Sequence, residues 1–312
     1  AFAEIRPTLP ALMEQASKEL DADEATARQE LGCDTDMADA GCEVAVRYNG
    51  FALRGFSPLT VFRTLAHGFA FAAHDPRVLG MSIVAPEDDP VALADYDLHM
   101  RMFRFLSEQF PTVKINPHAG ELAPGLVPPT ELRDHIAKAI AIAGAQRIGH
   151  GVDIAQEDNA AETLARMARD GIAVEINLTS NDVILGVSGA RHPIELYRAA
   201  GVPIVLSTDD EGVLRSDLTG EYLRAATEHG LGYRALKDIA RASLEYSFLP
   251  GDSLWGDGGI GGETVCSPFS TADAEPMQAC RNLIAGSEKA SEQWRLERAF
   301  ADFESKVATW TF

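Results

Sequence analysis

Positive charge is scarce in this sequence, which has 27 Lys and Arg residues against 47 Asp and Glu residues and a formal net charge of −20 at pH 7. A surface this acidic repels a phosphate backbone, so we expect no nucleic acid among the partners. Long apolar runs are also lacking, because stretches such as 69–73 and 136–145 are short or interrupted by polar residues or glycine. A membrane-spanning helix needs about 20 apolar residues, so we expect no membrane partner either.

Cysteine is rare as well. The chain has four, Cys33, Cys42, Cys266 and Cys280, and none has the CxxC spacing of a zinc–thiolate site. They form two local pairs, which fits two disulfides in an oxidising compartment or four free thiols. We take a periplasmic or secreted location as the leading interpretation and the cytoplasm as the alternative. No targeting segment is visible, but the chain opens on Ala1 rather than Met, so a preceding segment could have been removed.

A glycine-rich phosphate-binding turn between strand and helix is absent, which argues against an open nucleotide-binding sheet. What the sequence does contain is an alternation of short β-branched runs with longer amphipathic stretches, the pattern of parallel strands joined by helical crossovers. Strands are predicted at Ala3–Ile5, Glu43–Tyr48, Val78–Val84, Val113–Asn116, Arg147–Ile148, Ile172–Asn177 and Pro203–Ser207. Helices are predicted at Leu59–Ala73, Pro90–Glu108, Pro129–Ala143, Asp158–Asp170, Pro193–Ala200, Leu218–His229, Arg234–Ser247 and Glu288–Val307.

Polar side chains stand at the end of nearly every predicted strand. They are Arg6, Asn49, Glu87, Asp88, His118, Glu121, His150, Thr179, Ser180, Asn181, Asp209 and Asp210. Active sites assembled from the carboxyl ends of many strands are typical of barrels, so we predict an α/β fold, a TIM-type (β/α)8 barrel. Seven strands are found where this barrel needs eight, and we expect the first strand to precede Ala1 and to be missing from the chain.

Two domains are predicted from this organisation. Residues 1–250 are expected to form the metal-dependent barrel, lacking its first strand. Residues 251–312 are expected to form a Gly-rich loop, with Gly-Asp-Gly-Gly-Ile-Gly-Gly at 256–262, and a C-terminal helix packed on the outside of the barrel.

Three segments combine side chains suited to metal-assisted chemistry. In the first, His118 and Glu121 flank two small residues after a strand, which suits a metal ligand with a general acid or base; a buried histidine with a structural carboxylate is the alternative. In the second, His150 stands between two glycines, where it could polarise a water or lie in a solvated turn. In the third, Asp209 and Asp210 follow an apolar strand, where adjacent carboxylates call for a cation or a shared proton unless the turn is simply solvated.

Imidazole and carboxylate donors of this kind favour Zn²⁺ with a position left open for water. A zinc-bound water ionises near neutral pH and supplies a hydroxide nucleophile, which a nearby carboxyl group such as Glu121 can complement by donating a proton.

Four sequence motifs together resemble one known family. HAGE (118–121), RIGHG (147–151), EINLTSN (175–181) and LSTDD (206–210), in this order and spacing, resemble the adenosine deaminases of the zinc amidohydrolase superfamily. The resemblance runs from about Phe2 to Pro250. The longer runs PHAGELAPGLVPP and SNDVILGVSG are similar to the bacterial and secreted, growth-factor-related branch of that family.

The resemblance implies a hydrolytic reaction in which adenosine or 2′-deoxyadenosine gives inosine and ammonia. It implies that His118 and Asp209 ligate one Zn²⁺ per chain, with Asp209 also bridging toward the attacking water. The metal-bound hydroxide would attack C6 of the purine while Glu121 protonates N1, and His150 would orient the hydroxide and stabilise the developing charge.

The resemblance also implies two contacts that recognise the base. Asp210 would share a proton with N7, and the backbone at Gly80 would meet N3. The expected ligand is therefore a small-molecule purine nucleoside, and a homodimer is kept open as an assembly.

The chain departs from the family pattern in ways that bear on function. The family's His-x-His pair on the first strand, which gives two further zinc ligands, does not occur here, and Glu211 stands where the family commonly has proline. Surface or packing roles are expected for the other histidines, at positions 67, 74, 99, 135, 192 and 229.

These departures leave two alternatives open. One is another aminopurine substrate (adenine, a modified adenosine or AMP), although the net charge of −20 disfavours a phosphorylated one despite the available Arg6, Arg54 and Arg191. The other is a non-catalytic relative that binds a nucleoside or a receptor, if the chain truly starts at Ala1.

Overall fold

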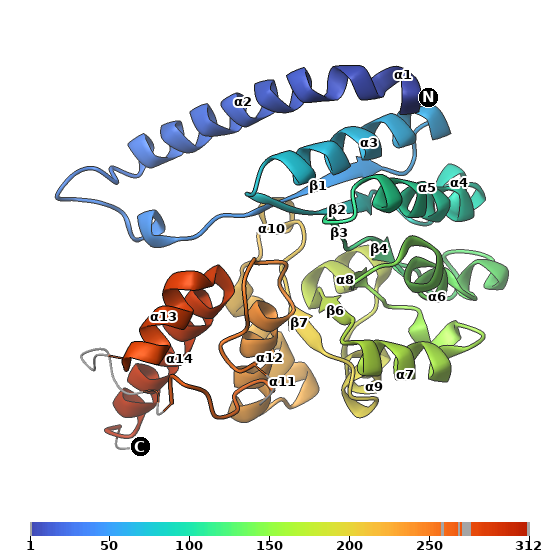
Figure 1. The fold of residues 1–312 in the computed structure, drawn as a ribbon. Coiled ribbons are helices and arrows are strands. Elements are labelled where there is room, and N and C mark those ends of the chain that lie inside the picture. Colours follow the sequence, from blue (N-terminus) through green and yellow to red (C-terminus); the bar gives the residue numbers. More distant parts are fainter. Residues whose placement is uncertain (1, 257–258, 268, 270–275, 311–312) are drawn as a thin grey trace. The chain divides into compact units, whose positions relative to one another are not determined.

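The computed structural model describes residues 2–256, 259–267, 269 and 276–310 (Figure 1). The chain divides into two compact units, residues 1–160 and residues 161–312. Among the described helices, none combines the length and the apolar character that crossing a bilayer requires.

The first unit is built on parallel strands. β1 (Tyr48–Leu53), β2 (Val78–Val84) and β3 (Lys114–Ile115) form one sheet with β2 in the middle. β4 (His118–Ala119) pairs in parallel with β5 (Arg147–His150), so that Ala119 lies in register with His150. The central strand β2 is apolar along most of its length and is buried at most positions, as expected for a parallel strand covered on both faces.

Helix α3 (Pro58–His74) covers this sheet in Figure 1 and shows why the sequence folds locally as it does. Ser57 accepts a hydrogen bond from the backbone of Thr60 and caps the helix, and Pro58 occupies the first turn, where its missing N–H costs nothing. The apolar stripe that includes Leu65 and Phe69 is fully buried where α3 packs against β1 and β2.

The remaining elements of the first unit are mostly helical. They are α1 (Phe2–Ile5), η1 (Arg6–Thr8), α2 (Leu9–Glu30), η2 (Ala40–Glu43), α4 (Pro90–Ala94), α5 (Tyr96–Gln109), η3 (Pro129–Leu132), α6 (His135–Lys138), the π-helical turn η4 (Ala139–Ala143) and η5 (Ile154–Gln156).

The described residues of the second unit include a parallel strand pair and a set of helices. β6 (Ala173–Ile176) pairs with β7 (Ile204–Leu206). Its helical elements are α7 (Ala160–Asp170), α8 (Leu178–Leu185), η6 (Gly189–Arg191), α9 (Ile194–Ala199), α10 (Glu211–Leu214), α11 (Leu218–His229), α12 (Tyr233–Glu245), α13 (Gln278–Gly286) and α14 (Glu288–Val307). Helix α12 packs on β7, and α14 packs on α12 and α13.

Most predicted strands are confirmed, but the first two need correction. Val78–Val84 is a strand over its whole predicted length. Ala3–Ile5 was expected to be a strand and instead lies in helix α1, because Phe2–Ile5 leads into the long helix α2, whose alanine and glutamate residues favour helix. The second strand was expected at Glu43–Tyr48 but begins only at Tyr48, since the alternating segment before it is exposed and joins no sheet.

Two residues that were expected at strand ends lie elsewhere because of these corrections. Arg6 lies in η1 and is not at a strand end, and Asn49 is near the start of β1. The expected helix Pro129–Ala143 is broken into η3, α6 and η4. The predicted division into residues 1–250 and 251–312 stays a prediction; α14 occupies the range expected for the C-terminal helix, whereas Asp257 and Gly258 of the Gly-rich loop lie outside the described residues.

Both cysteine pairs form disulfides. Cys33 is bonded to Cys42 and Cys266 to Cys280, with Cα–Cα distances of 5.5 Å and 4.8 Å. The second bond is buried in a small cluster with Trp255. Of the two alternatives that the sequence left open, the structure therefore contains the disulfides, the state that oxidising compartments maintain.

Thiol labelling should reflect this arrangement. We expect the unreduced, denatured protein to take up no alkylating reagent, because no cysteine is free, and the reduced protein to take up label at all four cysteines. Opening the 14-residue Cys266–Cys280 loop should also lower the free energy of unfolding by about 3 kcal/mol. Mass spectrometry of labelled protein checks the first expectation, and label on all four cysteines before reduction would contradict it.

Candidate active site

Two of the predicted site residues meet at neighbouring strands of the first unit. His118 opens β4 and His150 closes β5, and their rings pack edge to face with centroids 4.5 Å apart. Nε2 of His150 lies 3.2 Å from Nδ1 of His118. His150 is completely buried, whereas His118 is partly accessible, so the pair offers one imidazole toward solvent.

The carboxyl group of Glu121 lies beside the imidazole of His150. Its Oε1 lies 3.6 Å from Nδ1 of His150, and the residue is only 9% exposed. A carboxyl group shielded from water and next to an imidazole is suited to moving a proton to or from a bound molecule. The structure thus brings together His118, Glu121 and His150, as the sequence predicted.

Gly149 allows the His118 ring to lie where it does. A Cβ atom added to Gly149 would stand 2.6 Å from Cδ2 of His118 and 3.3 Å from its Cα. Only a glycine in the middle of the RIGHG segment therefore lets β4 and the His118 ring approach β5 this closely.

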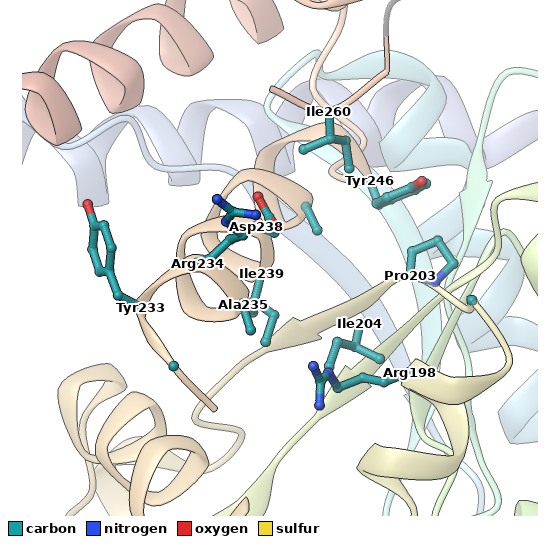
Figure 2. Close-up of a pocket in the computed structure, with 13 residues that line it drawn as sticks. Arg198, Pro203, Ile204, Tyr233, Arg234, Ala235, Asp238, Ile239, Tyr246 and Ile260 are labelled. Carbon is teal, nitrogen blue, oxygen red and sulfur yellow. The ribbon is translucent and has the colours of Figure 1, made fainter. Parts of the chain in front are cut away.

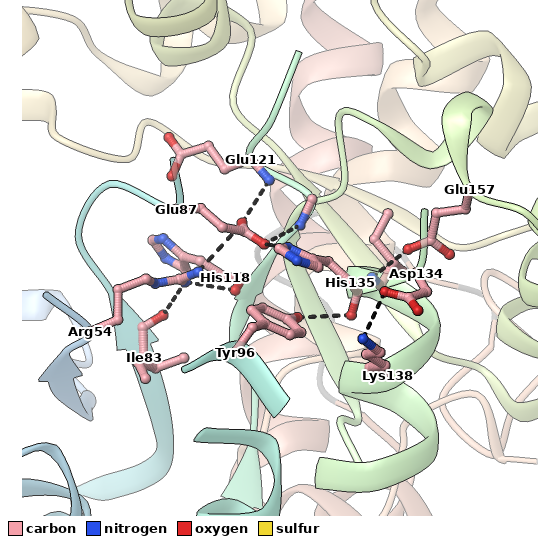
Figure 3. A network of polar contacts seen from close by, with 12 residues as sticks. Arg54, Ile83, Glu87, Tyr96, His118, Glu121, Asp134, His135, Lys138 and Glu157 are labelled. Carbon is pink, nitrogen blue, oxygen red and sulfur yellow. Dashed lines mark hydrogen bonds and ion pairs between the residues drawn. The ribbon is translucent and has the colours of Figure 1, made fainter. Parts of the chain in front are cut away.

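The loop that carries these groups is held by an ion pair that sequence reasoning did not assign to the site (Figure 3). Nη2 of Arg54 donates hydrogen bonds to the carbonyl oxygens of His118 (2.7 Å) and Ile83 (3.0 Å). The carboxylate of Glu87 accepts hydrogen bonds from the backbone N–H groups of Gly120 (3.1 Å) and Glu121 (2.9 Å). Nη1 of Arg54 lies 3.5 Å from Oε2 of Glu87, and both side chains are buried.

A third group completes this ion pair. Nδ1 of His135 donates to Oε1 of Glu87 at 2.6 Å, and the His135 ring stacks on Tyr96 with centroids 3.7 Å apart. The hydroxyl of Tyr96 donates to the carbonyl of His135 (Figure 3). Burial by itself raises the pKa of Glu87, but the charge of Arg54 and the hydrogen bond from His135 outweigh it and lower that pKa to about 2.

Asp153 is a further buried acid beside the loop. Its two carboxyl oxygens have no hydrogen-bond partner among the described residues, and burial, followed by the charges of Glu87 and Glu157, raises its pKa well above the usual range. Asp153 faces Gly120, since a Cβ atom added there would lie 2.4 Å from Oδ1 of Asp153.

The remaining predicted metal ligand belongs to the second unit. Asp209 follows β7 and accepts a hydrogen bond of 2.6 Å from Oγ of Ser180, which lies in α8. Helix α8 is in turn held by the buried Glu221, whose carboxylate accepts hydrogen bonds from the backbone N–H groups of Leu178 and Thr179. Asp209 is half-buried and Asp210 is exposed.

Backbone strain marks several strand ends. Ala85, His150 and Asp209 have φ angles of 82°, 69° and 56°, in the left-handed region that non-glycine residues rarely adopt. Each follows or closes a strand, namely β2, β5 and β7. Such strain costs about 1–2 kcal/mol per residue and persists mainly where function requires the conformation.

Gly80, which was expected to contact the base, does not lie at the end of a strand. It sits inside β2, in register with Asn49 and Lys114, four residues before the strand closes at Val84. The residue that follows the end of β2 is Ala85, which is half-buried.

A cavity of about 770 Å³ in the second unit lies away from these motifs in the sequence (Figure 2). It surrounds the start of β7 at Pro203 and Ile204 and is bordered by α12, with Arg198 and Arg234 at its rim. No predicted site residue lines it.

The chemistry of the predicted ligands suits zinc. His118 is partly accessible and offers an imidazole nitrogen, which zinc binds at about 2.0–2.1 Å. Asp209 is half-buried and offers a carboxylate oxygen. Zinc accepts both kinds of ligand.

Comparison with known proteins decides the family. The family model described as adenosine deaminase matches residues 1–254 of this chain. The chain belongs to the adenosine deaminase family. The resemblance drawn from the four sequence motifs is thereby confirmed.

Individual relatives agree with this assignment. An aminodeoxyfutalosine deaminase of Streptomyces coelicolor is 37% identical over 134 residues, covering 43% of this chain and 32% of its own length. An adenosine deaminase of Shewanella loihica is 30% identical over 209 residues, covering 66% of this chain and 57% of its own length. The chain thus matches between a third and three fifths of the length of these family members.

Solved structures agree on the fold. An amidohydrolase of Burkholderia ambifaria, determined with bound Zn, superimposes with a TM-score of 0.53 at 19% identity, covering 68% of this chain and 55% of the other. Together with the family, this likeness confirms the predicted α/β fold of TIM-barrel type.

Proposed function

We propose that the protein containing this chain hydrolytically deaminates an aminopurine nucleoside, with adenosine or 2′-deoxyadenosine as substrate and inosine or its deoxy form and ammonia as products. The observation that carries the proposal is the grouping of Glu121, His150 and His118 at the ends of β4 and β5, in a chain of the adenosine deaminase family. A shielded carboxyl group beside an imidazole is typical of a site that transfers protons, and a barrel that served only as a scaffold would not need it.

Each residue of the site has a role that follows from its chemistry. Glu121 delivers a proton to N1 of the purine, so that the ring nitrogen accepts the electrons displaced when water adds to C6. His150, next to Glu121, orients the attacking water and stabilises the charge that develops on it. On the second unit, Asp210 shares a proton with N7.

Contact with N3 falls to the backbone of β2. The family resemblance points to Gly80 for this role, and the structure adds Ala85 as a second candidate because its strained backbone stands at the strand end. A purine nucleoside is accordingly the proposed small-molecule partner.

His118 and Asp209 would hold a single zinc ion. When bound, zinc lowers the pKa of a coordinated water and so provides the nucleophile at neutral pH. The partly accessible imidazole of His118 supports this role, as does the carboxylate of Asp209, whose orientation is fixed by the hydrogen bond from Ser180.

A modified adenosine is the second candidate substrate. The Streptomyces coelicolor relative, which is 37% identical over its matched stretch, is an aminodeoxyfutalosine deaminase, so the family contains members that act on substrates other than adenosine. Both candidates use the same reaction at C6 and differ in what occupies the site beyond the base.

Turnover by the full-length protein tests the proposal. Purified zinc-loaded protein should reduce the absorbance at the adenosine maximum and release ammonia. A chelator should lower this rate, and added zinc should restore it. A parallel panel of 2′-deoxyadenosine, adenine, AMP and a 5′-modified adenosine identifies the substrate. Absence of ammonia from every one of these, with nucleoside binding retained, would overturn catalysis in favour of a binding protein.

A further inference from the structure

We propose that Glu87 is a positioning residue that, clamped between Arg54 and His135, fixes the backbone of residues 118–121 and thereby aims the side chains of His118 and Glu121. This inference rests on the proposed function for its catalytic consequence. The contacts on which it stands belong to the first unit alone.

Two oppositely charged side chains bind the backbone of residues 118–121, one at each end of the segment. Arg54 binds the carbonyl of His118 at 2.7 Å, and Glu87 binds the N–H groups of Gly120 and Glu121 at 3.1 and 2.9 Å. Charge-assisted hydrogen bonds of this kind are roughly twice as strong as neutral ones. Because Arg54 follows β1 and Glu87 follows β2, the loop is tied to the ends of two strands of the buried sheet.

Glu87 is itself held on several sides. The residue is 1% exposed, and its carboxylate lies 2.6 Å from Nδ1 of His135 and 3.5 Å from Nη1 of Arg54. The stacking of Tyr96 on His135 fixes the ring that makes the first of these bonds. Both oxygens of Glu87 are thereby committed, each to one backbone N–H group and to one side chain.

The position of Glu121 depends on this arrangement. Its backbone N–H binds Glu87, while Oε1 of its carboxyl group lies 3.6 Å from Nδ1 of His150. A displacement of about 1 Å in a reacting group can cost about 100-fold in rate. Release of the Glu121 N–H should therefore appear in the chemical step more than in substrate binding.

The substitution Glu87→Gln tests this role. Glutamine has the same shape but only one acceptor oxygen, so one backbone N–H group faces an NH₂ group and Arg54 loses its counter-charge. We expect kcat to fall about 10- to 100-fold with KM changed less than about threefold. Independently of turnover, we expect the amides of Gly120 and Glu121 to exchange with deuterium at least about tenfold faster.

Glu297→Gln is the matched control. Glu297 is also buried and also pairs with an arginine, Arg241, at 2.6 and 2.9 Å, but its oxygens hold none of the backbone of the 118–121 loop. This control should lose stability without losing kcat or accelerating amide exchange in the loop. Should Glu87→Gln not fold, Glu87→Asp, which keeps the charge and shortens the reach by one methylene, should show the same signature to a lesser degree.

The outcomes separate the two proposals. A folded Glu87 variant with unchanged loop exchange would overturn the positioning role, as would equal losses of kcat in the Glu87 and Glu297 variants. If the wild-type protein turns over no aminopurine, the proposed function fails, and the exchange comparison, which needs no substrate, still decides whether Glu87 holds the loop.

Discussion

Replacing Glu121 with glutamine is expected to lower kcat about 1,000-fold while leaving KM nearly unchanged. Glutamine keeps the shape of the side chain and the backbone hydrogen bond to Glu87, but it has no acidic proton to deliver to the purine ring. General acid catalysis by a well-placed group contributes about 100- to 10,000-fold, which sets the size of the expected loss. Steady-state kinetics on the zinc-loaded protein measures it.

Two controls isolate this effect. The free energy of unfolding of the Glu121→Gln protein should stay within about 1 kcal/mol of the wild type, because glutamine keeps the size of the side chain and the backbone hydrogen bond to Glu87. Glu108→Gln, on the exposed part of α5, makes the same chemical change with no expected effect on kcat. A kcat reduced less than about tenfold in the Glu121 variant would assign the proton transfer to another group.

The parts of the fold that could be predicted are those in which local pattern and burial agree. Val78–Val84 is a continuous apolar run, and it is a buried parallel strand over its whole length. Helix α2 (Leu9–Glu30) was missed because only Leu9 and Met13 of its residues are buried, so its sequence has no strong apolar stripe. The same absence of a stripe allowed Ala3–Ile5 to be taken for a strand.

In the site, too, the residues indicated by local sequence differ from those that only the structure identifies. The proximity of His118, Glu121 and His150 could be predicted because each lies at the end of a predicted strand, and the ends of neighbouring parallel strands meet. The group that holds them could not, because its hydrogen bonds join residues far apart in the chain: 33 positions from Glu87 to Gly120 and 64 from Arg54 to His118. A polar residue at a strand end was the only signal, and it marked Glu87 without indicating its partners.

Substituting Gly120 with alanine is expected to cost about 2–5 kcal/mol of unfolding free energy and most of the zinc affinity. Gly120 has a φ of +74°, which costs an alanine about 1–2 kcal/mol. The added methyl group would also stand 2.4 Å from Oδ1 of Asp153 and 2.8 Å from the side chain of Ile136, and overpacking of this kind costs about 1–3 kcal/mol. Denaturant unfolding and zinc titration measure the two losses.

Gly125→Ala separates the two causes. Gly125 lies on the same loop with a φ of +92°, but an added Cβ atom meets no described atom within 4 Å. Alanine there should therefore lower the free energy of unfolding only through its unfavourable backbone conformation. The difference between the two variants is then the cost of crowding at Asp153 and Ile136. Adding Asp153→Ala to Gly120→Ala removes one of the two clashes together with a buried acid that has no hydrogen-bond partner among the described residues, so the double variant should recover part of that difference. Equal losses of unfolding free energy in Gly120→Ala and Gly125→Ala would contradict this expectation, because they would show that the backbone near Asp153 shifts to make room for the methyl group. The close packing of Asp153 against Gly120 would then have no part in holding Glu121 in place.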